Sequence, residues 1–289
     1  MSAGTLLFLQ LAAHAPAAEP SATPECTGWA GAERDQRLRD AALTEVSGLA
    51  VLGPRRWVHN DSGDSARIFD AATEGRRAWS VALESVEAVD FEDMTYATIA
   101  GQSWLLVGDI GDNREHRPDI RVHRLREPSP GESSAQVESF VMTYPHGPQN
   151  AESMFVDPRS GALYILTKND GGRSAVYRAA LGDPSLSPAL HRVATVVFPN
   201  DRRGSQKATA AAISADGSHI AVRTYTDAWI WTRGEESVEA ALGGQPCRLR
   251  LQVEPQGEAI AWDGLDLLTV SEGAGSPFLR YRAVKEVGP

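Results

Sequence analysis

Hydrophobic and polar positions follow a pattern that recurs five times along the chain. Each repeat joins a short apolar strand, a turn rich in Gly, Pro or Asp, and a second strand of bulky and β-branched residues that ends in a polar cluster. The repeats are EVSGLAVLGPRRWVHND (residues 45–61), FEDMTYATIAGQSWLLVGDIGDN (91–113), AESMFVDPRSGALYILTKND (151–170), ATAAAISADGSHIAVRTYTD (208–227) and GEAIAWDGLDLLTVSEG (257–273).

The residue just ahead of each first strand serves as an anchor for measuring the repeat length. Successive anchors are 45 to 60 residues apart, which is the length of a four-stranded propeller blade with variable loops. The intervening segments supply candidate third and fourth strands, and only residues 33–42 and 236–242 show helical periodicity. The anchors are Ser47, Glu92, Glu152, Ala210 and Glu258.

These repeats predict an all-β chain, a five-bladed β-propeller. The last repeat has room for only three strands, so we expect the N-terminal segment, around residues 37–43, to supply the fourth and close the ring. A six-bladed propeller and a β-sandwich with coincidental similarity are the alternatives.

In a propeller, the anchors and the ends of the second strands meet at one mouth of the central channel. Ser47, Glu92, Glu152 and Glu258 are then candidate metal ligands, and Ala210 leaves the fourth position blank. We expect the strand ends to supply a ligand-binding set and a catalytic set. The first set is His59, Asn60, Asn113, Asn169 and Tyr225, and the second is Asp61, Asp109, Glu272, Lys168 and Arg223.

Three glutamates around one narrow channel need compensation when they are partly desolvated. A hard divalent cation with oxygen ligands provides it, and calcium suits a ring of ligands from separate blades. Zinc or copper would need more His or Cys than the single His59. The alternative is that the glutamates accept hydrogen bonds from backbone amides, and that the DSGD and GDIGDN stretches are plain turns.

Composition and charge limit the classes of molecule that the protein is expected to bind. The 289 residues are 42% hydrophobic and 23% charged, with a net charge of −10, which argues against nucleic acid or an anionic membrane surface as the main partner. We expect a monomer with a small, anionic ligand. The G-x-S-x-G, Walker, H-E-x-x-H and G-x-G-x-x-G motifs are absent, which argues against serine hydrolases, P-loop enzymes, zincins and Rossmann dehydrogenases.

The N-terminus predicts export. Residues 1–25 contain a short apolar run followed by small-x-small sequences and are expected to be a signal peptide or disordered leader, leaving residues 26–289 as one propeller domain in a secreted or periplasmic protein. No segment is apolar enough to span a membrane. The two cysteines, Cys26 and Cys247, favour one disulfide in such a compartment, and two unpaired thiols are the alternative.

The strings SGLA, WVHNDSGD, GDIGDN, NAESMFVDP and GEAIAW resemble a group of exported bacterial β-propeller proteins that are largely uncharacterised. More distantly, the anchor pattern is similar to that of calcium-activated nucleotidases, the soluble apyrases, which are five-bladed propellers. That resemblance implies a central calcium at Ser47, Glu92, Glu152 and Glu258. Ala210 departs from the pattern, although its carbonyl or the neighbouring Thr209 would be available.

Two hypotheses of function follow. In the first, the protein is a calcium-dependent hydrolase of a phosphorylated or ester-type small molecule. In the second, calcium only locks the ring and the channel mouth captures a ligand or protein without catalysis. A non-hydrolytic reaction such as lactone chemistry at the same site remains a third alternative.

Overall fold

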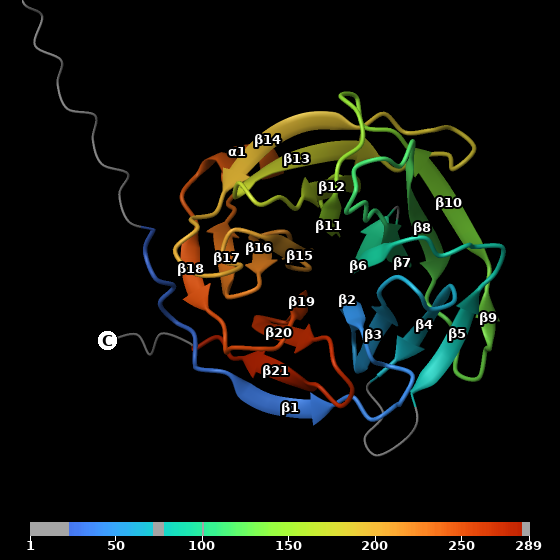
Figure 1. The fold of residues 1–289 in the computed structure, drawn as a ribbon, viewed down its shortest axis with the longest axis horizontal. Coiled ribbons are helices and arrows are strands. Elements are labelled where there is room, and N and C mark those ends of the chain that lie inside the picture. Colours follow the sequence, from blue (N-terminus) through green and yellow to red (C-terminus); the bar gives the residue numbers. More distant parts are fainter. Residues whose placement is uncertain (1–22, 72–77, 100, 285–289) are drawn as a thin grey trace, which may run out of the picture.

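The strands form a ring of five sheets around a central axis (Figure 1). This computed structural model describes residues 23–71, 78–99 and 101–284. Neighbouring strands within each sheet are antiparallel, except for one short parallel pair. The predicted five-bladed β-propeller is therefore confirmed, and the six-bladed and sandwich alternatives are wrong.

The first three blades follow the repeats in chain order, from the innermost strand outward. Blade one is β2 (Val46–Leu52), β3 (Arg55–Asn60), β4 (Arg67–Asp70) and β5 (Trp79–Leu83), extended by the parallel strand β9 (Ser134–Ala135). Blade two is β6 (Phe91–Ile99), β7 (Gln102–Asp109), β8 (Ile120–Arg126) and β10 (Val137–Met142). Blade three is β11 (Ala151–Val156), β12 (Ala162–Thr167), β13 (Arg173–Ala180) and β14 (His191–Val197).

The last two blades complete the ring. Blade four is β15 (Ala208–Ile213), β16 (His219–Thr224), β17 (Asp227–Thr232) and β18 (Cys247–Arg250), with α1 (Val238–Gly243) between its outer strands in sequence. Blade five is β19 (Gly257–Asp263), β20 (Asp266–Ser271), β21 (Pro277–Tyr281) and the N-terminal strand β1 (Glu33–Arg37). The innermost strands β2, β6, β11, β15 and β19 surround the axis (Figure 1).

The ring closes by the predicted sharing of strands between the two ends of the chain. Strand β1 pairs with β21, although helical periodicity had suggested a helix over residues 33–42. That prediction is wrong because the ladder to β21 satisfies the backbone of this segment, whereas the second predicted helix is confirmed as α1. Strand β1 begins and ends slightly earlier than residues 37–43, where the closing strand was expected.

The predicted disulfide between Cys26 and Cys247 is confirmed and fastens the N-terminal segment to blade four. Its two Cα atoms lie 4.8 Å apart, and the Cys26 amide donates a 2.9 Å hydrogen bond to the Arg248 carbonyl. Because β1 itself belongs to blade five, the same segment holds the last two blades together. The predicted leader of residues 1–25 lies mostly outside the described residues.

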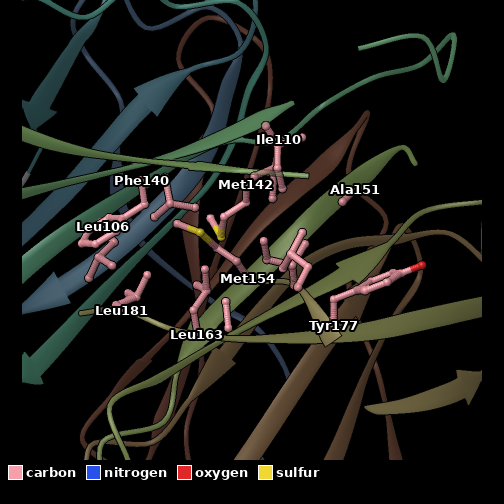
Figure 2. Packing of buried hydrophobic residues seen from close by; sticks show 14 of the residues in the cluster. Leu106, Ile110, Phe140, Met142, Ala151, Met154, Leu163, Tyr177 and Leu181 are labelled. Atoms are coloured by element: carbon pink, nitrogen blue, oxygen red, sulfur yellow. The ribbon is translucent and has the colours of Figure 1, made fainter. Parts of the chain in front are cut away.

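The hydrophobic core is distributed between the blades. Each of the five spaces between adjacent blades contains its own buried apolar cluster among the described residues. In the cluster between blades two and three, Met142 and Met154 meet among Leu106, Phe140 and Leu163 (Figure 2). Within the described ranges, no helix is long and apolar enough to cross a membrane.

Removing the disulfide tests its role in closure. The bond spans 221 residues of sequence, and a cross-link over so long a loop restricts the unfolded chain strongly. We expect Cys26→Ser combined with Cys247→Ser to lower the free energy of unfolding by ~2–5 kcal/mol, measured by urea denaturation. Reductant should move the wild-type midpoint to that of the variant and leave the variant unchanged. Equal midpoints without reductant would contradict a stabilising role.

Candidate functional site

A β-bulge near the start of every inner strand places the candidate site residues. In each blade, the pairing between the first two strands skips one residue of the inner strand. A bulge redirects the side chain of the extra residue, and here all five are at most 4% exposed. We call the channel mouth where they lie the bulge end. The five bulge residues are Ser47, Glu92, Glu152, Thr209 and Glu258.

The bulge shows that the predicted fourth anchor was misplaced by one residue. Ala208 pairs with Thr224 and Ala210 pairs with Arg223, so the skipped residue is Thr209. Its hydroxyl donates a 2.9 Å hydrogen bond to the Gly257 carbonyl of blade five. The Ser47 hydroxyl likewise donates a 2.5 Å hydrogen bond to the Glu92 carbonyl of blade two. The two hydroxyl positions therefore link neighbouring blades.

Three carboxylates gather at the bulge end between blades one and two. Asp61 follows β3, Asp90 precedes β6 and Glu92 is the bulge residue of β6, and one oxygen from each lies within 4.8 Å of the others. Gly111 permits this approach, because a Cβ atom there would lie 2.2 Å from Glu92 Oε1 and 2.5 Å from Asp90 Oδ2. This oxygen-only donor set fits a hard divalent cation such as calcium.

The pKa values of Asp90 and Glu92 show that nearby cations do not fully compensate the negative charge of this group. Burial raises the pKa of Asp90 to about 6, with a further contribution from the Asp61 carboxylate. Burial also raises the pKa of Glu92 well above its usual range, and the charges of Glu152 and Asp61 add to this effect. Within the described residues, the cations near this group are Arg117 and Lys168, and their ion pairs are with Asp109 and Glu152 rather than with Asp90 or Glu92.

A second group at the bulge end joins blades three, four and five. The Lys168 ammonium forms an ion pair with Glu152 and donates a 2.9 Å hydrogen bond to the Tyr225 hydroxyl. That hydroxyl in turn donates to Glu258 Oε1 at 3.1 Å. Burial alone would lower the pKa of Lys168, but the neighbouring carboxylates of Glu152 and Glu258 raise it above its usual range. Glu258 Oε2 is buried and has no hydrogen-bond partner in the described part of the chain.

The predicted metal ligands are therefore divided between two groups. Glu92 lies with Asp61 and Asp90, while Glu152 and Glu258 contact Lys168 and Tyr225. Ser47 connects to the first group through the Glu92 backbone. Asp90 was missed from the sequence, although its position two residues before Glu92 in VDFED was an available signal.

Glu272, a predicted catalytic residue, lies half-buried at the same mouth. Burial raises its pKa to about 7, and the charges of Glu258 and Asp61 contribute in the same direction. Gln256 Nε2 donates a 2.7 Å hydrogen bond to Glu272 Oε1.

Asp109 supports the site from beneath. It accepts hydrogen bonds from the Val89 amide at Oδ2 (3.2 Å) and from the Asp90 amide at Oδ1 (3.0 Å), and Arg117 Nη1 lies 2.8 Å from the same Oδ1. Burial opposes its ionisation, yet the neighbouring His123, Arg117 and the Asp90 amide hold its pKa below the usual value. Asp109 is thus a positioning residue for Asp90, because both its oxygens are occupied.

Arg223 and His59 are fully buried and packed between blades. The Arg223 guanidinium contacts Glu254 and donates to the Ala259 carbonyl at 2.8 Å, lying so close over Gly257 that a Cβ atom there would be 1.6 Å from Nη2. The His59 ring lies over Gly48 against Phe91, with a ring-centroid distance of 5.5 Å, and burial lowers its pKa. Both side chains pack neighbouring blades together.

Two of the predicted ligand-binding amides are engaged in local turns. Asn60 Nδ2 donates to the Ala42 carbonyl and to Asp64, both at 2.7 Å. Asn169 Nδ2 donates to the Arg173 carbonyl at 2.6 Å, and its Oδ1 accepts from the Gly171 amide. The side-chain amides of both residues are thus already engaged with protein groups.

Asn113 and Lys168 line an open pocket beside the two carboxylate groups. The pocket has a volume of about 290 Å³. Its other side chains are polar or charged and come from the loops of blades two to four. They are Arg114, Glu115, Asn150, Asn169, Asp170 and Lys207.

Asp93 is a buried residue that the sequence analysis did not single out. It follows the bulge residue Glu92 and is fully buried. Its carboxylate accepts hydrogen bonds from the Met94 and Met154 amides at 2.8 Å and from the Ala211 amide at 3.1 Å. These amides occupy equivalent positions, two residues after the bulge, in blades two, three and four. Asp93 thus ties three inner strands together at the axis.

Comparison with known proteins assigns no family and no activity to the chain. No protein-family model and no curated protein matches the chain. Among solved structures, it is similar to the soluble aldose sugar dehydrogenase of Escherichia coli in the apo-form, with a TM-score of 0.46, 10% identity, and coverage of 88% of this chain and 99% of that one.

It is also similar to Chaetomium thermophilum Sqt1 bound to the N-terminus of the ribosomal protein L10, with a TM-score of 0.40, 16% identity, and coverage of 85% of this chain and 66% of that one. At these scores the likeness concerns the fold alone.

The raised pKa values predict an unusual pH dependence of stability in the metal-free protein. Asp90 and Glu272 bind protons more tightly when folded, so their contribution is present below their unfolded pKa values and is lost as the pH rises through about 6 and about 7. Asp90→Asn combined with Glu272→Gln removes this loss.

We therefore expect the unfolding free energy of the wild type to fall relative to that of the double variant between about pH 4 and about pH 7. Urea denaturation at several pH values measures the difference. Burial lowers the pKa of His59, which contributes a pH dependence of the opposite sign. Both proteins contain His59, so the difference between wild type and double variant cancels that contribution. A difference that does not change with pH would contradict the assignment.

Proposed function

We propose that this protein is an exported, calcium-binding β-propeller that hydrolyses a phosphorylated or other ester-type small molecule at the bulge end. The observation that carries the proposal is the Asp61, Asp90 and Glu92 group, whose oxygens converge within 4.8 Å beside a polar pocket that contains Lys168. The disulfide supports export, because such bonds persist in oxidising compartments.

The chain's own residues would have distinct tasks. Asp61, Asp90 and Glu92 would hold the cation, with Ser47 and Asp109 fixing the backbone around them. When bound, a divalent cation supplies Lewis-acid polarisation of an ester or phosphoryl oxygen. Each ligand oxygen is carried by a bulge or by a strand end, so the donor set is held by rigid strands.

Proton transfer and charge stabilisation would fall to two further residues. Glu272 has a pKa of about 7 and is half-exposed, which suits a general base that accepts a proton at its carboxylate near neutral pH. Lys168 lines the pocket and carries a firmly held positive charge, which suits stabilisation of negative charge that develops on the substrate. We assign neither role to Arg223 or Asp109, because each is buried in an ion pair, with Glu254 and Arg117 respectively.

Calcium binding tests the first part of the proposal. Isothermal titration of metal-free wild type should show a site that weakens about tenfold or more in Glu92→Gln, because one anionic oxygen ligand is lost. Gly111→Ala should weaken it too without changing the charge, since its Cβ atom would displace Glu92 Oε1. Glu235→Gln, which changes an exposed carboxylate, is the matched control. No calcium binding by the wild type, or unchanged binding in Glu92→Gln, would refute the site.

Turnover tests the second part. A panel of phosphate and carboxylate esters should show calcium-dependent hydrolysis whose kcat/KM falls about 100-fold in Lys168→Ala, while Arg192→Ala on blade three serves as an exposed control. The wild-type rate should rise with pH through about 7 and level off above it. The Glu272→Gln variant should lack this rise in rate. A protein that binds calcium but is inert across the panel would favour the non-catalytic binding propeller.

A further inference from the structure

A large groove opens beside the bulge end, over blade four and its connection to blade five. It has a volume of about 760 Å³ and is lined by residues from three connections: the one that enters β15, the β16–β17 turn and the one between β18 and β19. Tyr225 forms part of its wall, and the hydroxyl of the same residue contacts Lys168 and Glu258. Lys207 lines both this groove and the pocket that contains Lys168. The groove and the candidate site are therefore contiguous.

The charge of the groove is opposite to that of the whole chain. Its lining includes the cations Arg202, Arg203 and Lys207, whereas the protein carries a net charge of −10. The one acidic residue in the lining, Glu254, has a side chain only 4% exposed and forms an ion pair with the buried Arg223. Positive charge thus dominates the solvent-facing part of the groove.

The three cations differ in how far they are already neutralised. Arg202 forms an ion pair with the buried Asp227, and Lys207 lies 2.5 Å from the exposed Asp170. Arg203 is exposed and has no acidic partner within the described residues. Its guanidinium is therefore free to bind an anionic group from solution.

The groove also offers unsatisfied polar atoms and apolar surface. Gln206 Oε1 and Arg202 Nε are buried and lack hydrogen-bond partners in the described part of the chain, which is costly unless a ligand or solvent satisfies them. Val253, which is 91% exposed, and Pro255 add apolar surface to the lining. The combination suits an organic anion with a neutral or apolar body.

We propose that this groove binds the distal part of the substrate, and that the substrate is an elongated organic molecule with two separate anionic groups. One group would lie beside Lys168 at the reacting end, and the second would bind Arg203. The inference rests on the proposed function, because it takes the reacting end to be the bulge end. It adds a class of substrate, the bis-anions, that the carboxylate groups alone do not specify.

A series of synthetic phosphates tests this inference with binding as the readout. The probes are butyl phosphate and the alkane-1,n-bisphosphates from butane upward, titrated calorimetrically into the calcium-loaded full chain. We expect one or two chain lengths of bisphosphate to bind about tenfold more tightly than butyl phosphate, because a second charge-assisted contact is gained. Arg203→Glu should abolish this gain and leave butyl phosphate binding unchanged, whereas Arg192→Glu, an equal charge change on blade three, should preserve it.

The outcomes separate the inference from the proposed function. Equal affinity for mono- and bisphosphates, or a gain that survives Arg203→Glu, would refute the proposal that the groove binds the second anionic group. Neither result would contradict the proposed reacting end. Loss of butyl phosphate binding in Lys168→Ala would support the reacting end independently. No binding of any phosphate by the wild type would reject both.

Discussion

The inner edge of each blade poses the constraint on which the rest of the structure depends. Five inner strands face the axis with backbone groups that no neighbouring strand can pair, and such groups are costly when they are buried. Side chains from other blades satisfy several of them. Ser47 donates to the Glu92 carbonyl, Thr209 to the Gly257 carbonyl and Arg223 to the Ala259 carbonyl, while Asp93 accepts from the amides of Met154 and Ala211.

This solution concentrates charge at the axis. The bulges that turn Ser47 and Thr209 toward neighbouring blades also turn Glu92, Glu152 and Glu258 inward. At these three positions a carboxylate replaces the hydroxyl, and a carboxylate has no proton to donate to a carbonyl when it is ionised. Lys168 and Tyr225 contact Glu152 and Glu258, whereas the oxygens of Glu92 lie close to two further carboxylates, Asp61 and Asp90. The raised pKa values of Asp90 and Glu92 reflect this lack of compensation, and the proposed cation would supply it.

Much of this arrangement was predictable from the sequence because it repeats. The strand pairs, the closure by the N-terminus and the positions of Glu92, Glu152 and Glu258 all follow from the spacing of the repeats. The fourth bulge residue was misplaced because ATAAAI offers four alanines around Thr209, so that small residues on both sides conceal the register.

The roles of the polar residues at the strand ends were harder to predict. Asn60, Asn169 and Asp109 carry groups that suit a ligand site and a turn equally well, and only the three-dimensional contacts show that they hold local backbone. Arg223 was expected at the channel mouth because it lies close to the end of its strand. Its side chain instead packs over Gly257, a contact between blades that the sequence of blade four alone does not contain.

The two ends of the central channel differ in the charged side chains that line them. At the end opposite the bulges, the inner strands of all five blades line a cavity of about 420 Å³ that includes Thr95, Tyr96 and Trp262 but no charged residue. Asp93 lies between the two ends, with its carboxylate saturated by three amides. A saturated carboxylate has little capacity left for a cation, and among the described residues no carboxylate, lysine or arginine lines the far cavity. The ionic chemistry proposed for this protein therefore belongs to the bulge end, where the bulges and the neighbouring strand ends bring the charged side chains together.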